Sequence, residues 1–466
     1  MEELEMNSAG MRVSHPVRLR KIAIAAAGLI LTAVSSAPHA SAQASPLPPK
    51  GEADVHGIYD RLLSQIEKIP IFDNHAHPAF ADDTDVDAMA APEGASEAFR
   101  IRETNPELAA AAKVLFGYPY GDFSPEHAKW LETKTTEMKK QQGAKYFSNI
   151  LDRVGIETVL ANRMAMPDYL EPARFRWVFF VDSLLFPFDN TQLEKRDSDE
   201  ALYLHLQERV LHRYMKQEGV SRLPDDLGGY EALIRNIVAD NQKRGGVAMK
   251  FEAAYFRSLY FSDPSRDEVE PIYRKYHAGG IPTNDEYRIF EDYVFRRLLD
   301  SALAFHLPVH FHSAVGIGDY YNLHEGNGLR LENVLRDPRY LGVTFVLLHG
   351  CYPWERQAIW LAAMKNVYLD SSLMELLMYP AALKDSLRQW LEVFPDKIVF
   401  GTDAFPFNDA LGAEVTFWFG VNSARKAIAA ALAEMVAEGE VTEARALELA
   451  HGYLHDNAAK LYPPLK

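Results

Sequence analysis

Short apolar runs alternate along the chain with longer segments in which hydrophobic residues recur at the helical period. The short runs are rich in β-branched and aromatic residues, and this alternation is typical of parallel strands connected by helices. It predicts an α/β fold, and α/β barrels of this length occur as one domain. Eight runs are expected to be strands: Pro70 to Asp73, Ile156 to Ala161, Arg176 to Val181, Gly246 to Phe251, Pro308 to Phe311, Val343 to Leu348, Val367 to Leu369 and Ile398 to Phe400.

Two connections between these runs are longer than a single helix requires. Roughly 80 residues separate the first run from the second, and roughly 60 separate the third from the fourth, which exceeds ordinary loop lengths. In an eight-stranded barrel such insertions follow the carboxyl ends of strands and lie over the pocket. We expect them to form walls around a substrate; the alternative is that they are peripheral helices.

The N-terminal segment has the pattern of a secretory signal peptide. A basic segment at 18–21 precedes an apolar run from Ile22 to Val34, and small residues follow up to Ala42. This order predicts cleavage after Ala42, with a mature chain that is periplasmic or secreted. A membrane anchor is the alternative, although the run is shorter than the ~20 residues that span a bilayer. The expected organisation is a signal peptide at 1–42, a lead-in and first helix at 43–68, and a barrel at 69–466.

Composition restricts the partners of this chain. Aromatic residues make up 11% and apolar residues 48% of the sequence, enough for a large core. The net charge of -16 disfavours nucleic acid or an anionic membrane surface as a partner. The single cysteine, Cys351, permits no intramolecular disulfide and no thiolate zinc cluster. We therefore expect a small-molecule substrate and no membrane contact after signal cleavage, and a homo-oligomer stays open.

Two histidines spaced by one residue end the first predicted strand. His75 and His77 follow the apolar segment that begins at Ile69. Because strand side chains alternate between faces, both imidazoles point to the same side and can grip one cation. Neutral imidazole is the commonest metal ligand. Taken alone, the pair fits equally well with two histidines in a loop.

Further ligand types follow other predicted strands. His312 comes after the fifth run, His349 after the sixth and Asp403 after the eighth. Because a barrel holds its active site at the carboxyl ends of its strands, we expect His75, His77, His312 and Asp403 to converge on one ion. Three imidazoles and a carboxylate suit Zn²⁺, Mn²⁺ or Fe²⁺ and leave room for a bound water. Taken alone, Asp403 would be a turn or helix-cap residue.

Several motifs together resemble the amidohydrolase superfamily. They are Asp73-Asn-His-Ala-His-Pro78, His312 with Gly316-Ile-Gly-Asp319, Leu347-Leu-His-Gly-Cys-Tyr-Pro353 and Phe400-Gly-Thr-Asp-Ala404. The tail from Leu454 to Tyr462 is similar to the closing helix of the amidohydrolase-related branch, which includes the amidohydrolase-like domain fused to glutamine synthetase-like proteins. The resemblance implies a distorted (β/α)8 TIM barrel with helical insertions over the carboxyl face.

The resemblance also implies roles for individual residues. Those matching His75, His77, His312 and Asp403 would bind a catalytic divalent metal, with Zn²⁺ expected first, while His349 would bind a second ion or stabilise an oxyanion. A metal-bound water has its pKa lowered towards ~7. Asp403 could then take the proton of this water and return it to a leaving amine or alcohol.

Lys250, near the end of the fourth predicted strand, has two interpretations. Some superfamily members carry a carboxylated lysine there that bridges two metals, so Lys250 is a further candidate ligand. An unmodified ammonium would repel a cation and would instead hold a substrate carboxylate, which we favour. Tyr255, Arg163 and Arg257 are the other candidates for substrate binding. The family pattern expects an arginine where Phe256 stands, and an arginine in either position is more often a solvated surface residue or a structural ion-pair partner.

The sequence therefore predicts an exported metal-dependent hydrolase of a C–N (amide-type) or C–O bond in a small molecule. The alternative is a non-oxidative decarboxylase, since the related branch also contains lyases. A non-catalytic binding protein is disfavoured because the full ligand set is present, including the expected base, Asp403.

Overall fold

The computed structural model describes residues 54–80, 82–86, 98–102, 104–196, 198–313, 315–316, 321–406 and 412–463. The expected signal peptide and most of its lead-in lie outside these ranges, so both stay predictions. Among the residues that are described, none of the helices combines the length and the apolar character needed to cross a membrane.

Eight parallel strands pair in sequence order. They are β1 (Ile71–Ala76), β2 (Ile156–Asn162), β3 (Phe175–Phe180), β4 (Gly246–Phe251), β5 (Val309–Phe311), β6 (Phe345–Leu347), β7 (Val367–Asp370) and β8 (Ile398–Val399). All eight predicted runs are thus confirmed as strands. The backbone N–H of Asn74 donates to the carbonyl of Phe400 at 2.9 Å, and that of His77 to Ala404 at 2.7 Å. Because β1 is bonded in this way to the end of β8, the sheet closes, and the predicted TIM barrel is confirmed.

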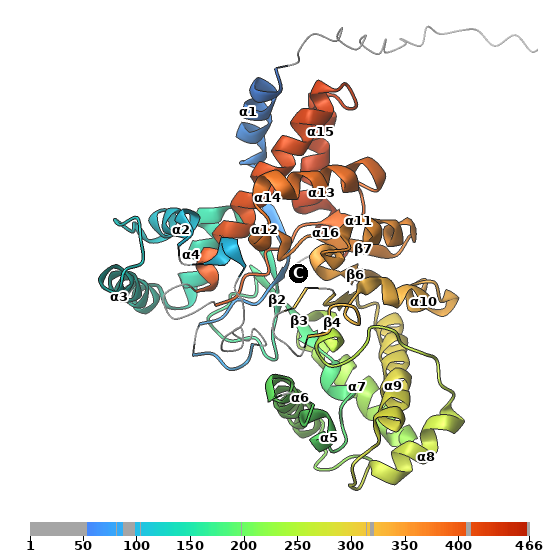
Figure 1. Cartoon of the computed structure of the whole chain (residues 1–466). Coiled ribbons are helices and arrows are strands. Elements are labelled where there is room, and N and C mark those ends of the chain that lie inside the picture. The colour runs from blue at the N-terminus through green and yellow to red at the C-terminus, as the bar shows by residue number, and fades with distance from the viewer. Residues whose placement is uncertain are drawn as a thin grey trace, which may run out of the picture. The chain divides into compact units, whose positions relative to one another are not determined.

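Helices surround the strands (Figure 1). Their bounds are α1 (Val55–Ile66), α2 (Pro106–Phe116), α3 (Pro125–Gln142), α4 (Tyr146–Val154), α5 (Thr191–Glu194), α6 (Ser198–Gln217), α7 (Leu227–Lys243), α8 (Arg266–Tyr276), α9 (Asn284–Phe305), α10 (Glu332–Leu335), α11 (Glu355–Ala358), α12 (Met374–Leu377), α13 (Pro380–Val393), α14 (Ala413–Ala437), α15 (Glu443–His451) and α16 (Asn457–Ala459). Local signals set their ends. Thr283 and Glu286 form a reciprocal capping box at the start of α9.

The two long connections are helical, and their expected role as walls around a substrate stays a prediction. The first, between β1 and β2, contains α2, α3 and α4, and the second, between β3 and β4, contains α5, α6 and α7. Figure 1 shows the two groups on different sides of the strands. The longest helix, α14, packs against α1, α2, α4 and α13. The first insertion is therefore fixed to the helical shell of the barrel.

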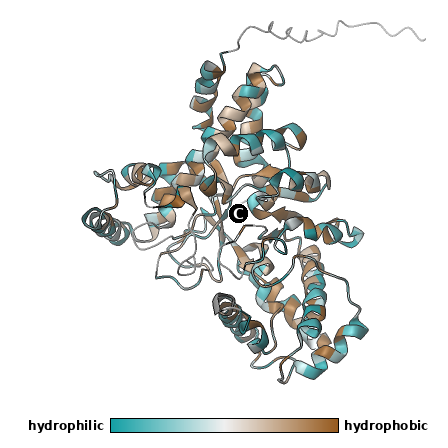
Figure 2. Ribbon diagram, in the orientation of Figure 1, coloured by the Kyte–Doolittle hydropathy of each residue, from teal (hydrophilic) through white to brown (hydrophobic). Residues whose placement is uncertain are grey.

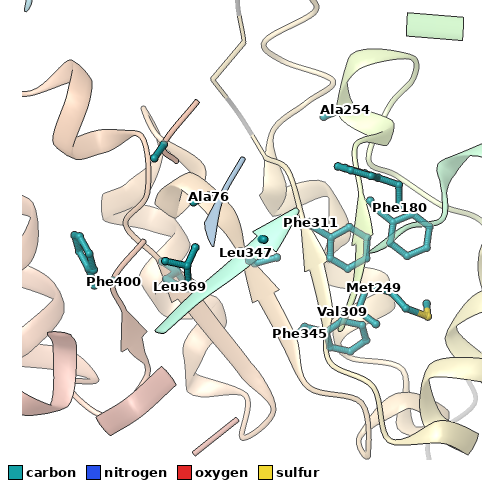
Figure 3. Close-up of a cluster of buried hydrophobic side chains, with 14 of the residues drawn as sticks. Ala76, Phe180, Met249, Ala254, Val309, Phe311, Phe345, Leu347, Leu369 and Phe400 are labelled. Atoms are coloured by element: carbon teal, nitrogen blue, oxygen red, sulfur yellow. The ribbon is translucent and has the colours of Figure 1, made fainter. Parts of the chain in front are cut away.

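The apolar core forms two clusters. The larger one lies between strands and helices and includes Phe311, Phe345 and Leu369 (Figure 3). Hydrophobic residues accordingly concentrate around the strands, whereas outer helices such as α3 are largely hydrophilic (Figure 2). We call the second cluster the barrel floor. It consists of Phe72, Leu160, Val178, Ala248, Val346, Leu348 and Val399, together with Ala458 and Tyr462 from the C-terminal tail.

The barrel floor lies on the interior face of the strands, below a layer of buried polar residues. Side chains two positions apart on a strand share a face. Phe72 thus shares its face with Asn74, Leu160 with Asn162, and Ala248 with Lys250. All three polar side chains are fully buried. The barrel interior therefore changes from apolar to polar towards the carboxyl ends of the strands.

Candidate metal centre

Three ligand atoms converge where β1 ends and the chain leaves β8. Asp403 Oδ1 lies 3.1 Å from His75 Nε2 and 3.3 Å from His77 Nε2, and the two nitrogens are 3.2 Å apart. Donor atoms bound at about 2.0 to 2.1 Å around one tetrahedral ion lie about 3.4 Å from one another. The spacing and the chemistry of this His₂Asp set therefore fit a divalent metal ion.

The backbone at this end of the barrel adopts conformations that side-chain-bearing residues rarely take. Asp403 has φ 53° and His349 has φ 60°, both in the left-handed region. The N–H of Asp403 donates to the carbonyl of His75 at 2.7 Å and holds this conformation in place. Strain of this kind persists where surrounding contacts fix it, and it clusters at functional sites.

Two further buried residues, Asn162 and Asp73, support His75 and the loop that carries Asp403. The side-chain amide nitrogen of Asn162 lies 2.8 Å from His75 Nδ1, which directs Nε2 towards Asp403. Asp73 accepts hydrogen bonds from the Thr402 N–H at 2.9 Å and from the Thr402 hydroxyl at 2.6 Å. It thereby ties β1 to the loop that carries Asp403. Burial raises the pKa of Asp73 to about 8, despite these bonds.

His312 and His349 form a second pair beside the three ligand atoms. His349 Nε2 lies 3.1 Å from His312 Nδ1, and the rings of His75 and His349 are 5.3 Å apart. The other nitrogen of His312, Nε2, lies 2.9 Å from the carbonyl of Val315. The structure thus places His312 next to the predicted centre, in contact with His349 and not with the convergent atoms. Its role as a metal ligand stays a prediction.

Burial keeps the imidazoles neutral. It lowers the pKa of His75 and of His312 well below the usual range and that of His349 to about 4, and the nearby Lys250 charge adds to the effect. Burial alone would raise the pKa of Asp403, but hydrogen bonds from His75 and His77 outweigh it and the pKa falls well below its usual value. At neutral pH the site therefore offers uncharged imidazoles and one carboxylate, the forms that bind metals.

Lys250 and Tyr255, both predicted to bind substrate, lie close to the histidines. The Lys250 side chain is fully buried, and Nζ has no hydrogen-bond partner among the described residues. Its nearest carboxylate oxygen, on Glu252, is 3.9 Å away. The Tyr255 ring lies 4.5 Å from the ring of His312. Both residues therefore lie beside the histidines, and their role in substrate binding stays a prediction.

Arg163 and Arg257 are held by buried ion pairs. Arg163 donates to Asp83 at 2.5 Å and to the carbonyl of Pro78 at 2.7 Å, which fixes the loop after His77. Arg257 donates to Glu291 at 2.7 Å and to Asp292 at 2.5 Å. These contacts match the structural alternative considered for both arginines. Substrate binding by either residue stays a prediction without a supporting contact in the described parts of the chain.

A second group of possible ligands lies on the surface. Glu194 of α5 approaches His205 and Glu208 of α6, and His205 Nε2 is 3.2 Å from Glu194 Oε1. The His205 side chain is 58% exposed. An ordinary ion pair in water accounts for this contact.

The geometry above defines a class: a TIM barrel whose strand ends carry a candidate His₂Asp metal site. A family model described as amidohydrolase matches residues 272–463. Protein fluG of Emericella nidulans is 31% identical over 245 residues, which are 50% of this chain and 27% of that protein. This chain therefore spans about a quarter of its relative's length.

Solved structures share the fold. A Lactobacillus casei protein assigned as a metal-dependent hydrolase has a TM-score of 0.57 at 18% identity, covering 86% of this chain and 96% of its own. Uronate isomerase of Thermotoga maritima has a TM-score of 0.55 at 12% identity, covering 87% and 97%. Uronate isomerase of Bacillus halodurans has a TM-score of 0.55 at 13% identity, covering 88% and 96%.

These matches confirm the resemblance predicted from the motifs. The chain is similar to amidohydrolase-related proteins, and the match to the family model covers residues 272–463. The convergent His₂Asp group offers the ligand types of a divalent metal site, in keeping with this similarity.

Proposed function

We propose that this protein is an exported metal-dependent hydrolase that cleaves a C–N (amide-type) or C–O bond in a small molecule. The observation that carries the proposal is the convergence of the Asp403 carboxylate with the Nε2 atoms of His75 and His77 at 3.1 and 3.3 Å. A carboxylate in this position can contact a metal and still exchange a proton with water.

The residues around this point divide the chemistry of hydrolysis among them. His75, His77 and Asp403 would hold a divalent ion, which would supply the Lewis acidity that activates water and polarises a carbonyl group. Zn²⁺ suits this ligand set. Since Asp403 Oδ1 faces the two imidazoles, Oδ2 accepts the proton of the attacking water and returns it to the leaving amine or alcohol. His349, neutral and adjacent, stabilises negative charge on the substrate oxygen.

Lys250 narrows the class of substrate. Its buried ammonium has no hydrogen-bond partner among the described residues and pairs with Glu252 only at 3.9 Å, and a buried charge that lacks hydrogen bonds is costly. A carboxylate on the substrate would supply that partner. We therefore favour a carboxylate-bearing substrate over a carboxylated Lys250 that bridges two ions.

Non-oxidative decarboxylation is the second candidate, and the same lysine favours it. A cation that holds a carboxylate beside the histidines would also orient that group for release as CO₂. Burial lowers the pKa of His75 and of His312, and the charge of the nearby Lys250 lowers both further.

Isotope labelling separates the candidates. Purified metal-loaded protein is incubated with N-acyl amino acids, carboxylate esters, hydroxybenzoates and uronates in H₂¹⁸O and in D₂O. Hydrolysis places solvent oxygen in the acid product, decarboxylation releases CO₂ and adds a solvent deuteron to carbon, and isomerisation leaves the formula unchanged. Label in the acid product is the expected result. CO₂ release or isomerisation without such label contradicts the hydrolase proposal.

A matched substrate pair tests the role of Lys250. In a Lys250→Met variant, which keeps the length of the side chain, KM for the carboxylate substrate should rise about 10-fold or more, since a charge-assisted contact is lost. KM for the same compound with its carboxylate amidated should not change. An equal loss for both compounds would instead indicate a role in the metal centre.

Export is tested at the N-terminus. In a bacterial host we expect mature protein in the periplasm, beginning between Gln43 and Ser45, since the small-residue motif ends at Ala42. Mass spectrometry of intact protein decides this point. Retention of Ile22 to Val34 in the membrane fraction would show an anchor instead.

A further inference from the structure

The C-terminal tail closes the barrel interior below the histidine sites. The Tyr462 side chain is buried in the barrel floor, where its ring stacks on Phe72 at 5.8 Å and meets the edge of His310 at 5.9 Å. Arg176 of β3 donates to the carbonyl of Pro463 at 2.6 Å and holds the tail in place. An element from the far end of the sequence thus completes the core inside β1 to β8.

The Tyr462 hydroxyl is a polar group at the end of an otherwise apolar side chain. It donates to Asn74 Oδ1 at 2.5 Å and lies 2.7 Å from His310 Nε2. The Asn74 amide nitrogen in turn donates to Asp370 Oδ2 at 2.7 Å. Since the phenolic hydrogen is directed to Asn74, His310 donates its own Nε2–H to the phenolic oxygen. Every polar group in this chain of contacts is buried.

The chain of contacts continues from Asp370 to His349. Asp370 Oδ1 accepts the N–H of Ser372 at 2.7 Å, and Ser372 Oγ lies 3.0 Å from His349 Nδ1. The loop before Asp403 packs on the same carboxylate, because a Cβ added to Gly401 would lie 2.8 Å from Asp370 Oδ2. Asn74, at the other end of the amide contact, directly precedes His75. The Tyr462 network therefore reaches each strand end that carries a residue of the centre.

We propose that Tyr462 is a positioning residue for the metal centre. Its hydroxyl fixes the Asn74 amide, and through Asn74 and Asp370 it fixes the backbone before His75 and the ring of His349. Loss of the hydroxyl would leave Asn74 Oδ1 buried without its donor, which costs free energy and frees the amide to rotate. Substitution of residues that orient metal ligands commonly weakens metal binding by about 10- to 100-fold.

The test is the dissociation constant for Zn²⁺ of the full chain, measured by competition with a chelator in the absence of substrate. In Tyr462→Phe, which removes the hydroxyl alone, we expect this constant to rise about 10-fold. Tyr230→Phe is the matched control. Tyr230, on α7, is also buried, and its hydroxyl donates to the carbonyl of Leu184 at 2.7 Å. This control should lose stability without losing affinity for Zn²⁺.

Two further variants keep the proposal falsifiable if Tyr462→Phe folds poorly. Arg176→Gln loosens the tail without touching the polar network and should weaken Zn²⁺ binding by a smaller factor. In a double-mutant cycle, Asn74→Ala and Tyr462→Phe should act non-additively on the dissociation constant, since one residue acts through the other.

Equal Zn²⁺ dissociation constants for Tyr462→Phe and Tyr230→Phe would overturn the proposal, and so would additivity with Asn74→Ala. The inference depends on the metal site but not on the reaction. A wild-type chain that binds no Zn²⁺ would refute both the site and the inference, whereas binding without hydrolysis would refute only the proposed function.

Discussion

At the carboxyl ends of the strands, the buried side chains that face one another are polar. At the barrel floor they are apolar. Burial itself is similar at the two ends: His75 and Leu160 are both fully inaccessible, and Asp403 is 8% exposed. Removing apolar surface from water stabilises the floor by roughly 25 cal/mol per Å². Burying imidazoles and a carboxylate destabilises the fold unless a ligand or hydrogen bonds compensate for the lost contact with water.

The two ends of the barrel thus have different roles: the floor contributes stability, and the strand ends carry the groups for chemistry. The floor is stabilised by apolar packing and needs no ligand. The metal centre holds His75, His77 and Asp403 within 3.3 Å of one another, a spacing suited to a shared cation. A layer of buried polar residues, which includes Asn74 and Lys250, lies between the apolar floor and the metal centre. The predictions that follow are ordered by their expected effect on the chemistry of the metal centre.

The largest effect should come from removing both imidazoles of β1. A His75→Ala, His77→Ala double variant should lose its bound metal and all turnover, because only Asp403 of the convergent group remains. Elemental analysis of purified protein measures the metal content. His205→Ala, in the surface group, is the control and should retain full content. Unchanged metal in the double variant would contradict the assignment of the site.

Replacing the proposed base should have a smaller effect. Asp403→Asn keeps an oxygen ligand of similar size but removes the basic form, so turnover should fall about 10²-fold or more while some metal remains bound. His349→Asn should lower turnover in a way that depends on metal concentration if it binds a second ion. If His349 only polarises the substrate, the loss should not depend on metal. Asp403→Asn with confirmed metal and unaltered turnover would refute the proposed role of Asp403.

Metal addition should stabilise the folded protein through the site at the carboxyl ends of the strands. Zn²⁺ at 100 times its dissociation constant should raise the free energy of unfolding of the apo protein by about 2.7 kcal/mol, because only the folded chain presents the assembled site. Chemical denaturation with and without Zn²⁺ measures the difference. The double histidine variant should show no such increase. A full increase in that variant would place the stabilising metal elsewhere.

The smallest effect on the centre should come from the floor. Leu160→Ala should lower the free energy of unfolding by about 2–5 kcal/mol, the usual cost of a large buried side chain. The Zn²⁺ dissociation constant of the folded protein should change less than about 2-fold, since the leucine side chain carries no polar link to the ligands. A large loss of affinity in this variant would show that the two ends are coupled through packing as well as through Tyr462.

Local patterns sufficed to predict the eight strands and the two histidines of β1. Strand periodicity depends on neighbours along the chain, and a pair spaced by one residue stays on one face in any strand. The positions of Asp403 and His349 after predicted strands pointed to the same end of the barrel, and the amidohydrolase motifs implied roles for both residues. The pairing of Arg163 with Asp83 and of Arg257 with Glu291 and Asp292 was beyond reach, since the partners are distant in sequence or on other elements.

Asn162 and Asp370 show the same limit within the candidate site. Neither stands in a motif that marks it as part of the site. Asn162 acquires its role because β2 lies beside β1, and Asp370 because closure of the barrel brings β7 near β1, with β8 between them. A search for polar residues two positions after an apolar residue near the end of a predicted strand would have found both.

The sequence by itself determined the α/β class, the order of the strands and the residue types offered at their carboxyl ends, because periodicity and short-range spacing are properties of the chain. Only the tertiary structure decided which of those residues meet. Closing β1 onto β8 brings Asp403 to His75 and His77, and inserting the tail brings Tyr462 to Asn74. Contacts between residues separated by more than 300 positions depend on how the whole barrel packs, and no local pattern encodes that packing.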